Sequence, residues 1–301
     1  MTPREIIAAA WAITKREKSL VRWGFTSAFL ETLLNLKLIS YQAYFLYAAI
    51  KGENVGFFDD AIWLRNHTAP WLFVTIIAFF LLLLGVEFFI PKMATGAIIG
   101  LAAKSAKGEK VKGGLVMAIM NFLPILAIQE MFVLGGWAMA VTLCSVILRY
   151  LESDIRWIMV GGVVFFWLLS NILKFFASFA EEAVVIRKAG IFEGIGQSTK
   201  LIVSYLGHIV FLLILLFVIS LRILFNAVAV LLIPGIVIGL GILFMTFLSV
   251  TLSVIIAGCI GLALVVVASY FFGYLHVFKQ TVWTLTYLEL KKHKDLDVIE
   301  D

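Results

Sequence analysis

The sequence predicts an all-α protein, a polytopic transmembrane helical bundle with six spans, interfacial amphipathic helices and one extra membrane-embedded segment. Two observations lead to this prediction. Only 14% of the residues are charged and 62% are apolar, with a mean hydropathy of +1.06. Several apolar runs also reach the ~20 residues that an α-helix needs to cross about 30 Å of hydrocarbon. Together these features leave little of the 301-residue chain for a water-soluble domain.

The pattern divides the chain into three parts. Residues 1–22 form a cytoplasmic interfacial helix, residues 23–290 a single transmembrane domain, and residues 291–301 a charged cytoplasmic tail. Within residues 2–18, helical spacing gathers the less polar side chains on one face and leaves the basic ones elsewhere, which indicates an interfacial amphipathic helix. The residues on that face are Ile6, Ile7, Ala10, Trp11 and Thr14.

The first half of the domain holds three expected spans. The first covers residues 23–50 and is weakened by charged side chains, whereas residues 70–90 form a clean apolar span that contains Glu87. Pro91 then predicts a break or kink, because proline removes a backbone hydrogen bond. A turn at Gly108 and a surface helix follow, and the third span covers residues 122–149.

In the second half, a long helix is expected over residues 157–188 and a surface helix over residues 190–205. Residues 206–274 are almost entirely apolar and are too long for two simple crossings. We therefore expect residues 233–257, which contain Pro234, to enter the membrane without completing a crossing.

The distribution of basic residues predicts the orientation. Sixteen Lys and Arg residues fall on one side of the expected spans and four on the other. The positive-inside rule therefore places both termini in the cytoplasm of a multi-pass protein of the cell membrane, and it requires an even number of crossings. The basic cytoplasmic face includes Lys104, Lys107, Lys110 and Lys112.

Two segments share a plan that suggests a weak internal repeat. They read KSAKGEKVKGGLVMAIMNFLPIL from Lys104 and VIRKAGIFEGIGQSTKLIVSYLGHI from Val185. In each, a span is expected to end at a glycine-containing turn, and a surface helix then leads into the next span. Repeated units are common in membrane proteins, where binding sites lie at the interface between repeats.

Three stretches carry a family resemblance. They are KREKSLVRWGF from Lys15, AVVIRKAGIFEGIGQSTKLIVSYLGH from Ala183 and FKQTVWTLTYLEL from Phe278. Together they resemble the membrane domain of glycerophosphodiester phosphodiesterases and related uncharacterised prokaryotic polytopic membrane proteins. The resemblance implies a six-helix membrane module, which in some relatives accompanies a separate soluble phosphodiesterase domain. The sequence contains no such catalytic domain, so we expect no phosphodiesterase activity.

Ionisable residues inside the expected spans are the candidate site. A charge at bilayer depth costs roughly 2.5–3.5 kcal/mol on insertion scales unless it is paired or hydrated. Counting residues inward along antiparallel spans predicts that Glu130 pairs with Lys174, with Glu87 or Asn171 nearby. Such a pair would either hold helices together or line a path for protons or a solute. Glu181 and Glu182, close to Arg187, are expected to form a solvated helix end.

The sequence shows no motif for catalysis, metal binding or a cofactor. Nucleophile elbows, phosphate-binding loops and His-Glu helix motifs are missing. The four histidines have no metal-ligand spacing, and Cys144 and Cys259 lie apart in apolar runs, where we expect them to be packing residues. We therefore expect a protein that is not an enzyme and has no cofactor.

Two functions rank ahead of a third, an intramembrane enzyme. The first is a non-enzymatic membrane module, a scaffold or a lipid- or envelope-associated partner, whose basic face rests on anionic headgroups. The alternative is a small-solute or ion transporter that uses Glu87, Glu130 and Lys174. A protein partner or a homo-oligomer fits either function. The net charge of +5 is distributed for a membrane surface and not for nucleic acid.

Overall fold

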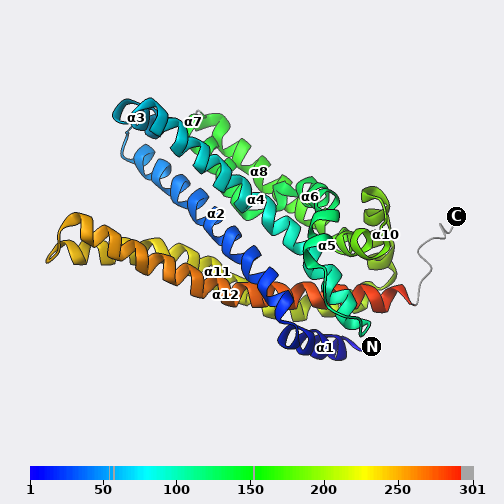
Figure 1. Cartoon of the computed structure of the whole chain (residues 1–301). Coiled ribbons are helices and arrows are strands. Elements are labelled where there is room, and N and C mark those ends of the chain that lie inside the picture. The colour runs from blue at the N-terminus through cyan, green and yellow to red at the C-terminus, as the bar shows by residue number, and fades with distance from the viewer. Residues whose placement is uncertain (54, 57, 152, 293–301) are drawn as a thin grey trace.

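The computed structural model is all-helical (Figure 1). It describes every residue except 54, 57, 152 and 293–301, and it leaves out the side chains of residues 153, 154, 215, 216 and 218–231. No β-strand occurs in this part of the chain. The elements are α1 (Pro3–Arg16), α2 (Lys18–Ile50), α3 (Asp59–His67), α4 (Pro70–Ala106), α5 (Gly114–Met120), α6 (Phe122–Met131), the 3₁₀ turn η1 (Val133–Gly135), α7 (Trp137–Tyr150), α8 (Ser153–Phe176), α9 (Ala180–Glu182), the π-helical turn η2 (Ala183–Arg187), α10 (Ile191–Ser204), α11 (Leu206–Met245) and α12 (Val250–Lys291).

Three described helices are long and apolar enough to cross a membrane: α4, Ile155–Phe176 of α8, and α12. Two bent helix pairs raise the number to five if each pair forms one span. The pair α5 and α6 is bent by 55°, and α10 with the start of α11 is bent by 91°. A multi-pass membrane protein is therefore the class that the fold supports.

Several element boundaries differ from the prediction. The helix α4 continues through Pro91 to Ala106, so this proline does not break it. The expected third span is divided into α6, η1 and α7, and the expected long helix after it ends at Phe176. The turn at Gly108 is confirmed by the positive φ of 72° at this glycine.

Residues 233–257 form no separate segment. Residues 233–245 continue α11 beyond Pro234, residues 246–249 make a turn, and the rest begins α12. The two helices contain 40 and 42 residues, or roughly 60 Å each at about 1.5 Å per residue. Each of the two helices is therefore longer than the roughly 30 Å of a hydrocarbon core. Their length accounts for the apolar stretch over residues 206–274 without an additional membrane-embedded segment. Figure 1 shows them as one long antiparallel hairpin.

Side-chain exposure changes abruptly along α4. In residues 71–89 large apolar side chains are exposed, for example Trp71 at 70% and Leu82 at 66%. Residues 94–103 are buried and mostly small, and among them Ala94 and the larger Ile98 and Leu101 are fully enclosed. Small residues allow close helix packing, and a Cβ added at Gly96 would lie 2.9 Å from Ile125 Cδ1.

The same change occurs in α12. Large apolar residues are exposed from Val250 to Phe271, whereas Val277 and Val282 are fully buried. We call the part of the molecule that contains α1, α5, α9, α10, residues 94–106 and residues 277–290 the packed end. Figure 1 shows the N-terminus, α5 and α10 at this end and α3 at the opposite end.

The helix α1 packs against α12 and α4 at the packed end. Ile6, Ala10 and Thr14, three members of the predicted face, are buried, and Ile7 packs beside them. Trp11 is 39% exposed and makes edge-on ring contacts with α12. The apolar face of α1 is therefore largely covered by protein. Its N-terminus is fixed by a capping box between Thr2 and Glu5.

Candidate functional site

Glu130 pairs with Lys92 of α4, at 2.8 Å between Nζ and Oε1. Lys174, the predicted partner, makes no ion pair with Glu130 within 4.0 Å, so this prediction is wrong. The prediction of a Glu130–Lys174 pair counts residues along one continuous third span. In the structure α6 follows a bend of 55° after α5 and is itself separated from α7 by η1. Lys92 directly follows Pro91 in the unbroken α4 and faces α6 across the helix interface.

Glu87 forms a second ion pair, with Lys37 of α2. Lys37 Nζ lies 2.6 Å and 2.8 Å from the two carboxylate oxygens of Glu87, whose side chain is fully buried. The lysine side chain remains 30% exposed. The pair neutralises a charge inside the apolar half of the helices, as lipid requires. It is separate from the Lys92–Glu130 pair, so Glu87 and Glu130 do not share a partner.

Asn171 serves a structural role. Its side-chain amide donates to the carbonyl oxygens of Gly135 at 3.1 Å and Trp167 at 2.8 Å. Ser170, the preceding residue, donates to the carbonyl of Phe132 at 3.3 Å. The bonds to Gly135 and Phe132 satisfy carbonyls at the break between α6 and α7, which explains why polar residues occur at this position of α8.

Glu181 and Glu182 do not form a solvated helix end. Glu182 is fully buried on α9, and its Oε1 accepts a hydrogen bond of 2.8 Å from Gln280 of α12. Its other oxygen is buried and has no hydrogen-bond partner. Burial, reinforced by the charge of Glu181, raises the pKa of Glu182 well above its usual range.

Glu181 is half-buried and accepts a hydrogen bond of 2.9 Å from Gln129 of α6. Burial raises the pKa of Glu181, although this hydrogen bond and three nearby lysines act in the opposite direction. Those lysines come from α8, α4 and α12 and are Lys174, Lys92 and Lys279. Glu181 therefore joins a larger group of charges.

We call this group the charge cluster. It lies where the exposed parts of α4, α8 and α12 meet the packed end. Its members interact electrostatically across α2, α4, α6, α8, α9 and α12. They are Glu31, Lys92, Glu130, Lys174, Glu181 and Lys279.

Three members of the cluster are exposed: Glu31, Lys174 and Lys279. Each interacts electrostatically with the other two. None of the three side chains makes a hydrogen bond, or an ion pair within 4.0 Å, with another described residue. These three side chains are therefore exposed charges of both signs without an ion-pair partner among the described residues.

Sequence reasoning identified Lys174 and Glu130 but missed the rest of the cluster. Glu31 is one of the charged side chains that weaken the first expected span, and Lys92 and Lys279 do not belong to the predicted site. A usable signal was present, because Lys92 lies two residues beyond the end of the apolar run 70–90. A charged residue at the end of a span is placed at the membrane boundary by the length of the span alone.

The four predicted basic residues lie together at the packed end. Lys107, Lys110 and Lys112 are exposed in and beside the turn between α4 and α5. Lys104 Nζ donates to the carbonyl of Lys112 at 3.1 Å and so closes this loop. The exposed ammonium groups form a basic surface apart from the charge cluster.

The described residues contain no group of three or more His, Cys, Asp or Glu side chains that could hold a metal ion. Cys144 is half-buried and Cys259 is exposed on α12. The expectation that Cys259 packs inside the protein is therefore wrong, and its position on the exposed half of α12 suits contact with lipid.

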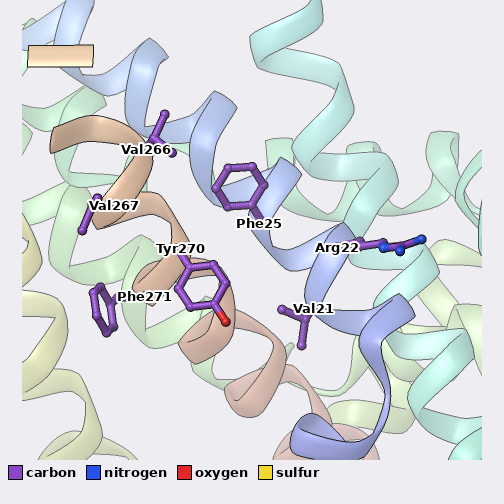
Figure 2. Close-up of a pocket in the computed structure, with 7 residues that line it drawn as sticks. All are labelled: Val21, Arg22, Phe25, Val266, Val267, Tyr270 and Phe271. Atoms are coloured by element: carbon purple, nitrogen blue, oxygen red, sulfur yellow. The ribbon is translucent and has the colours of Figure 1, made fainter. Parts of the chain in front are cut away.

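An open groove of about 470 Å³ lies between α2 and α12. Figure 2 shows the rings of Phe25, Tyr270 and Phe271 along it, with Val266 and Val267. The side chain of Arg22 points away from the rings of Tyr270 and Phe271 in this view. The groove is apolar, so it carries no chemistry of its own, and the charge cluster is the better candidate site.

Comparison of the chain with known protein families, with curated proteins and with solved structures finds no match.

Proposed function

We propose that the protein is a non-enzymatic membrane module that crosses the cell membrane six times and binds lipid headgroups at its packed end. Both termini lie in the cytoplasm in this proposal. The charge cluster and the basic surface are the parts that meet the headgroups. The resemblance of the sequence to the membrane domain of glycerophosphodiester phosphodiesterases supports this proposal, because it implies a helical membrane module of this kind.

The length of the exposed apolar segments carries this proposal. Residues 71–89 of α4 and 155–173 of α8 each contain 19 residues, and residues 250–271 of α12 contain 22. At about 1.5 Å per residue they extend for roughly 28–33 Å, close to the ~30 Å of a hydrocarbon core. The charge cluster lies where these segments end, at the level that headgroups would occupy.

The crossings follow from the order of the helices. The helix α2 leads from the packed end toward α3, and α4 returns. The bent elements α5 to α7 and then α8 make the next two crossings, and the hairpin of α11 and α12 makes the last two. With the basic loop after α4 at the packed end, the positive-inside rule assigns that end to the cytoplasm.

Labelling with a membrane-impermeant maleimide tests this topology. The variants are Glu53→Cys, in the loop before α3, and Lys110→Cys, in the loop after α4, both with Cys144→Ala and Cys259→Ala. In intact cells we expect position 53 to react and position 110 to react only after lysis. Reaction of both positions, or of position 110 alone, before lysis would refute the topology.

Lipid binding tests the function itself. After extraction from anionic bilayers, native mass spectrometry should show bound phospholipid on the wild-type protein. Replacing Lys107, Lys110 and Lys112 by Gln should lower the retained anionic lipid, because each basic residue near a charged surface contributes about 1 kcal/mol. Lys51→Gln, an exposed lysine at the opposite end, is the matched control. Wild-type protein that retains no lipid would contradict the proposal.

Transport is the second candidate function, and the two ion pairs on α4 favour it. Lys37–Glu87 lies about 7.5 Å farther along α4 than Lys92–Glu130, given five residues at ~1.5 Å. Farther from the packed end, Tyr41 of α2 donates a hydrogen bond of 3.2 Å to Asp60 of α3. If the protein transports protons, proteoliposomes that contain it should lose an imposed proton gradient. The Glu87→Gln variant should abolish this proton leak. A gradient equally stable with and without protein would exclude a proton path.

A further inference from the structure

The open groove between α2 and α12 lies beside the packed end. The rings of Phe25, Tyr270 and Phe271 border it (Figure 2). Tyr270 and Phe271 are 54% and 59% exposed, so the groove opens to the outside of the bundle. It lies where the exposed apolar segment 250–271 of α12 ends. Its volume of about 470 Å³ is within the roughly 300–1,000 Å³ of ligand pockets in proteins.

Lys18 shares a face of α2 with residues that line the groove. Lys18, Val21 and Phe25 follow one another at spacings of three and four residues, which places them on one side of the helix. Val21 and Phe25 line the groove. Lys18 begins the helix and precedes Phe25 by seven residues, or about 10 Å along the axis. The exposed side chain of Lys18 therefore belongs to the end of the groove that is nearest the packed end.

Aromatic contacts connect the same end of the groove to Lys15 of α1. On α12, Tyr274 follows the groove residue Tyr270 by one helical turn. The ring of Trp11 contacts Tyr274 edge-on, with 5.5 Å between the ring centroids. Lys15 Nζ lies 4.9 Å from the centroid of the Trp11 ring. Tryptophan and tyrosine are enriched at the headgroup level of membrane proteins, so this end of the groove has the side chains of a headgroup site.

Lys15 and Lys18 are free to bind an anion. Neither makes an ion pair within 4.0 Å with another residue in the described part of the chain. They are three residues apart, so their Cα atoms lie within about 11 Å of each other. Glu17, between them in the sequence, already accepts hydrogen bonds from Arg16 at 2.9 Å and Ser105 at 3.1 Å. An oxyanion at this end of the groove would therefore meet two ammonium groups, and Glu17 would not compete with it.

We propose that the groove binds one phospholipid with an anionic headgroup. The part of an acyl chain next to the glycerol lies against Phe25 and Phe271, and Lys15 and Lys18 bind the phosphate. This site rests on the proposed function and specifies where one lipid binds. An apolar helix of another protein, or of a second copy of this chain, would fill the groove but leave both ammonium groups without a counter-charge. A free phosphate would leave the aromatic groove unfilled.

Lipid affinity in nanodiscs tests the charged end of the site. Native mass spectrometry of the full-length protein, at increasing phosphatidylglycerol content in phosphatidylcholine, gives the affinity of the most tightly retained phosphatidylglycerol. The double variant Lys15→Gln and Lys18→Gln should lower this affinity by about 30-fold, the effect of two basic residues at a charged surface. Lys51→Gln is the matched control, because Lys51 Nζ also lies over a ring, 4.8 Å from the centroid of Tyr47, but at the opposite end of the molecule. It should leave the affinity unchanged.

Filling the groove tests its apolar part. Val267→Trp places a large ring in the groove, from a position that is 56% exposed and so tolerates it. The affinity for phosphatidylglycerol should fall at least 10-fold. Val254→Trp is the matched control, because Val254 has the same exposure on the same helix but lies 13 residues, or about 20 Å, farther along α12. It should bind the lipid like wild type.

The site requires both the lysine variant and Val267→Trp to lose affinity. Wild-type affinity in either one, with unaltered thermal unfolding, would overturn the site and leave the proposed function intact. Displacement of the lipid by millimolar inorganic phosphate would overturn the assignment to a lipid. A wild-type dimer that Val267→Trp converts to a monomer would show that a second copy occupies the groove instead. A wild-type protein that retains no lipid at all would contradict the proposed function itself.

Discussion

Gly24 of α2 lies directly against Gly273 of α12. A Cβ added at Gly273 would approach Phe25 Cα to 2.6 Å, and one added at Gly24 would lie 2.5 Å from the carbonyl oxygen of Gly273. No side chain fits between the two backbones at these distances. The contact fixes the crossing of α2 and α12 next to the packed end.

Gly273→Ala should therefore destabilise the protein. Overpacking of this kind costs roughly 1–3 kcal/mol, and thermal unfolding in detergent measures it. Gly258→Ala on the same helix is the matched control, because a Cβ at Gly258 meets nothing within 4 Å. The control should be neutral or slightly stabilising, since alanine favours helix over glycine by up to about 1 kcal/mol. Equal effects of the two variants would argue against the close crossing.

A double-mutant cycle tests the partner of Glu130. The variants are Lys92→Met, Glu130→Gln and their combination, with Lys174→Met and Glu130→Gln as the parallel cycle. We expect a coupling energy of about 0.5–1 kcal/mol for Lys92 with Glu130, because interhelical polar pairs in membranes have this magnitude. Lys174 should show almost none. Stronger coupling to Lys174 than to Lys92 would contradict the observed ion pair.

Removing Lys37 and removing Glu87 should lower the free energy of unfolding by different amounts. Lys37→Met leaves a fully buried carboxylate without a counter-charge and should cost up to roughly 3–5 kcal/mol. Glu87→Gln leaves a lysine that is 30% exposed and can reach water, so its cost should be smaller. The double variant Lys37→Met and Glu87→Leu should recover part of the loss. Unfolding curves in which Glu87→Gln is the more damaging variant would refute this order.

The raised pKa of Glu182 predicts how stability depends on pH. The folded protein retains this proton to a higher pH than the unfolded chain, whose carboxyl titrates near 4.5. The contribution of Glu182 to stability is fully present below pH 4.5 and is lost as the pH rises through the folded pKa. Glu182→Gln mimics the protonated side chain and should make the protein more stable than wild type above that range.

Unfolding measured from pH 4.5 to 9 compares the two proteins. The difference in stability between variant and wild type should widen with pH and then level off. Glu53→Gln, at an exposed carboxylate in the loop before α3, is a suitable control for general charge effects. A constant difference across the whole range would show that Glu182 titrates alike in the folded and unfolded states.

Composition and hydropathy were sufficient to predict the helical class, because uninterrupted apolar runs of about 20 residues have the length at which a single α-helix crosses the hydrocarbon with its backbone hydrogen bonds satisfied internally. The surface helix expected over residues 190–205 appears as α10. Span boundaries were harder to predict. Residues 94–106 are apolar because they pack against α5 and α6, and hydropathy does not distinguish protein neighbours from lipid.

The ion pairs could not be derived by counting residues along the spans. That method requires straight helices with known starting levels, whereas the region between α5 and α7 is bent and interrupted. The backbone of the two segments of the suggested internal repeat also differs from what their sequences indicate. Gly108 has a positive φ of 72°, but in the second segment it is Lys188, and not Gly190, that adopts the left-handed conformation. Similar glycine spacing therefore does not mean similar backbone geometry here.

The depth of α12 in a bilayer decides whether the charge cluster lies at the membrane boundary. Spin labels are placed at positions 262, 267, 271 and 279 of a variant without native cysteines, and their accessibility to oxygen and to a water-soluble nickel chelate is measured. The account predicts that labels at 262, 267 and 271 are accessible to oxygen and that the label at 279 is accessible to the chelate. A label at 279 as deep in lipid as the one at 262 would contradict the placement of the charge cluster at the membrane boundary.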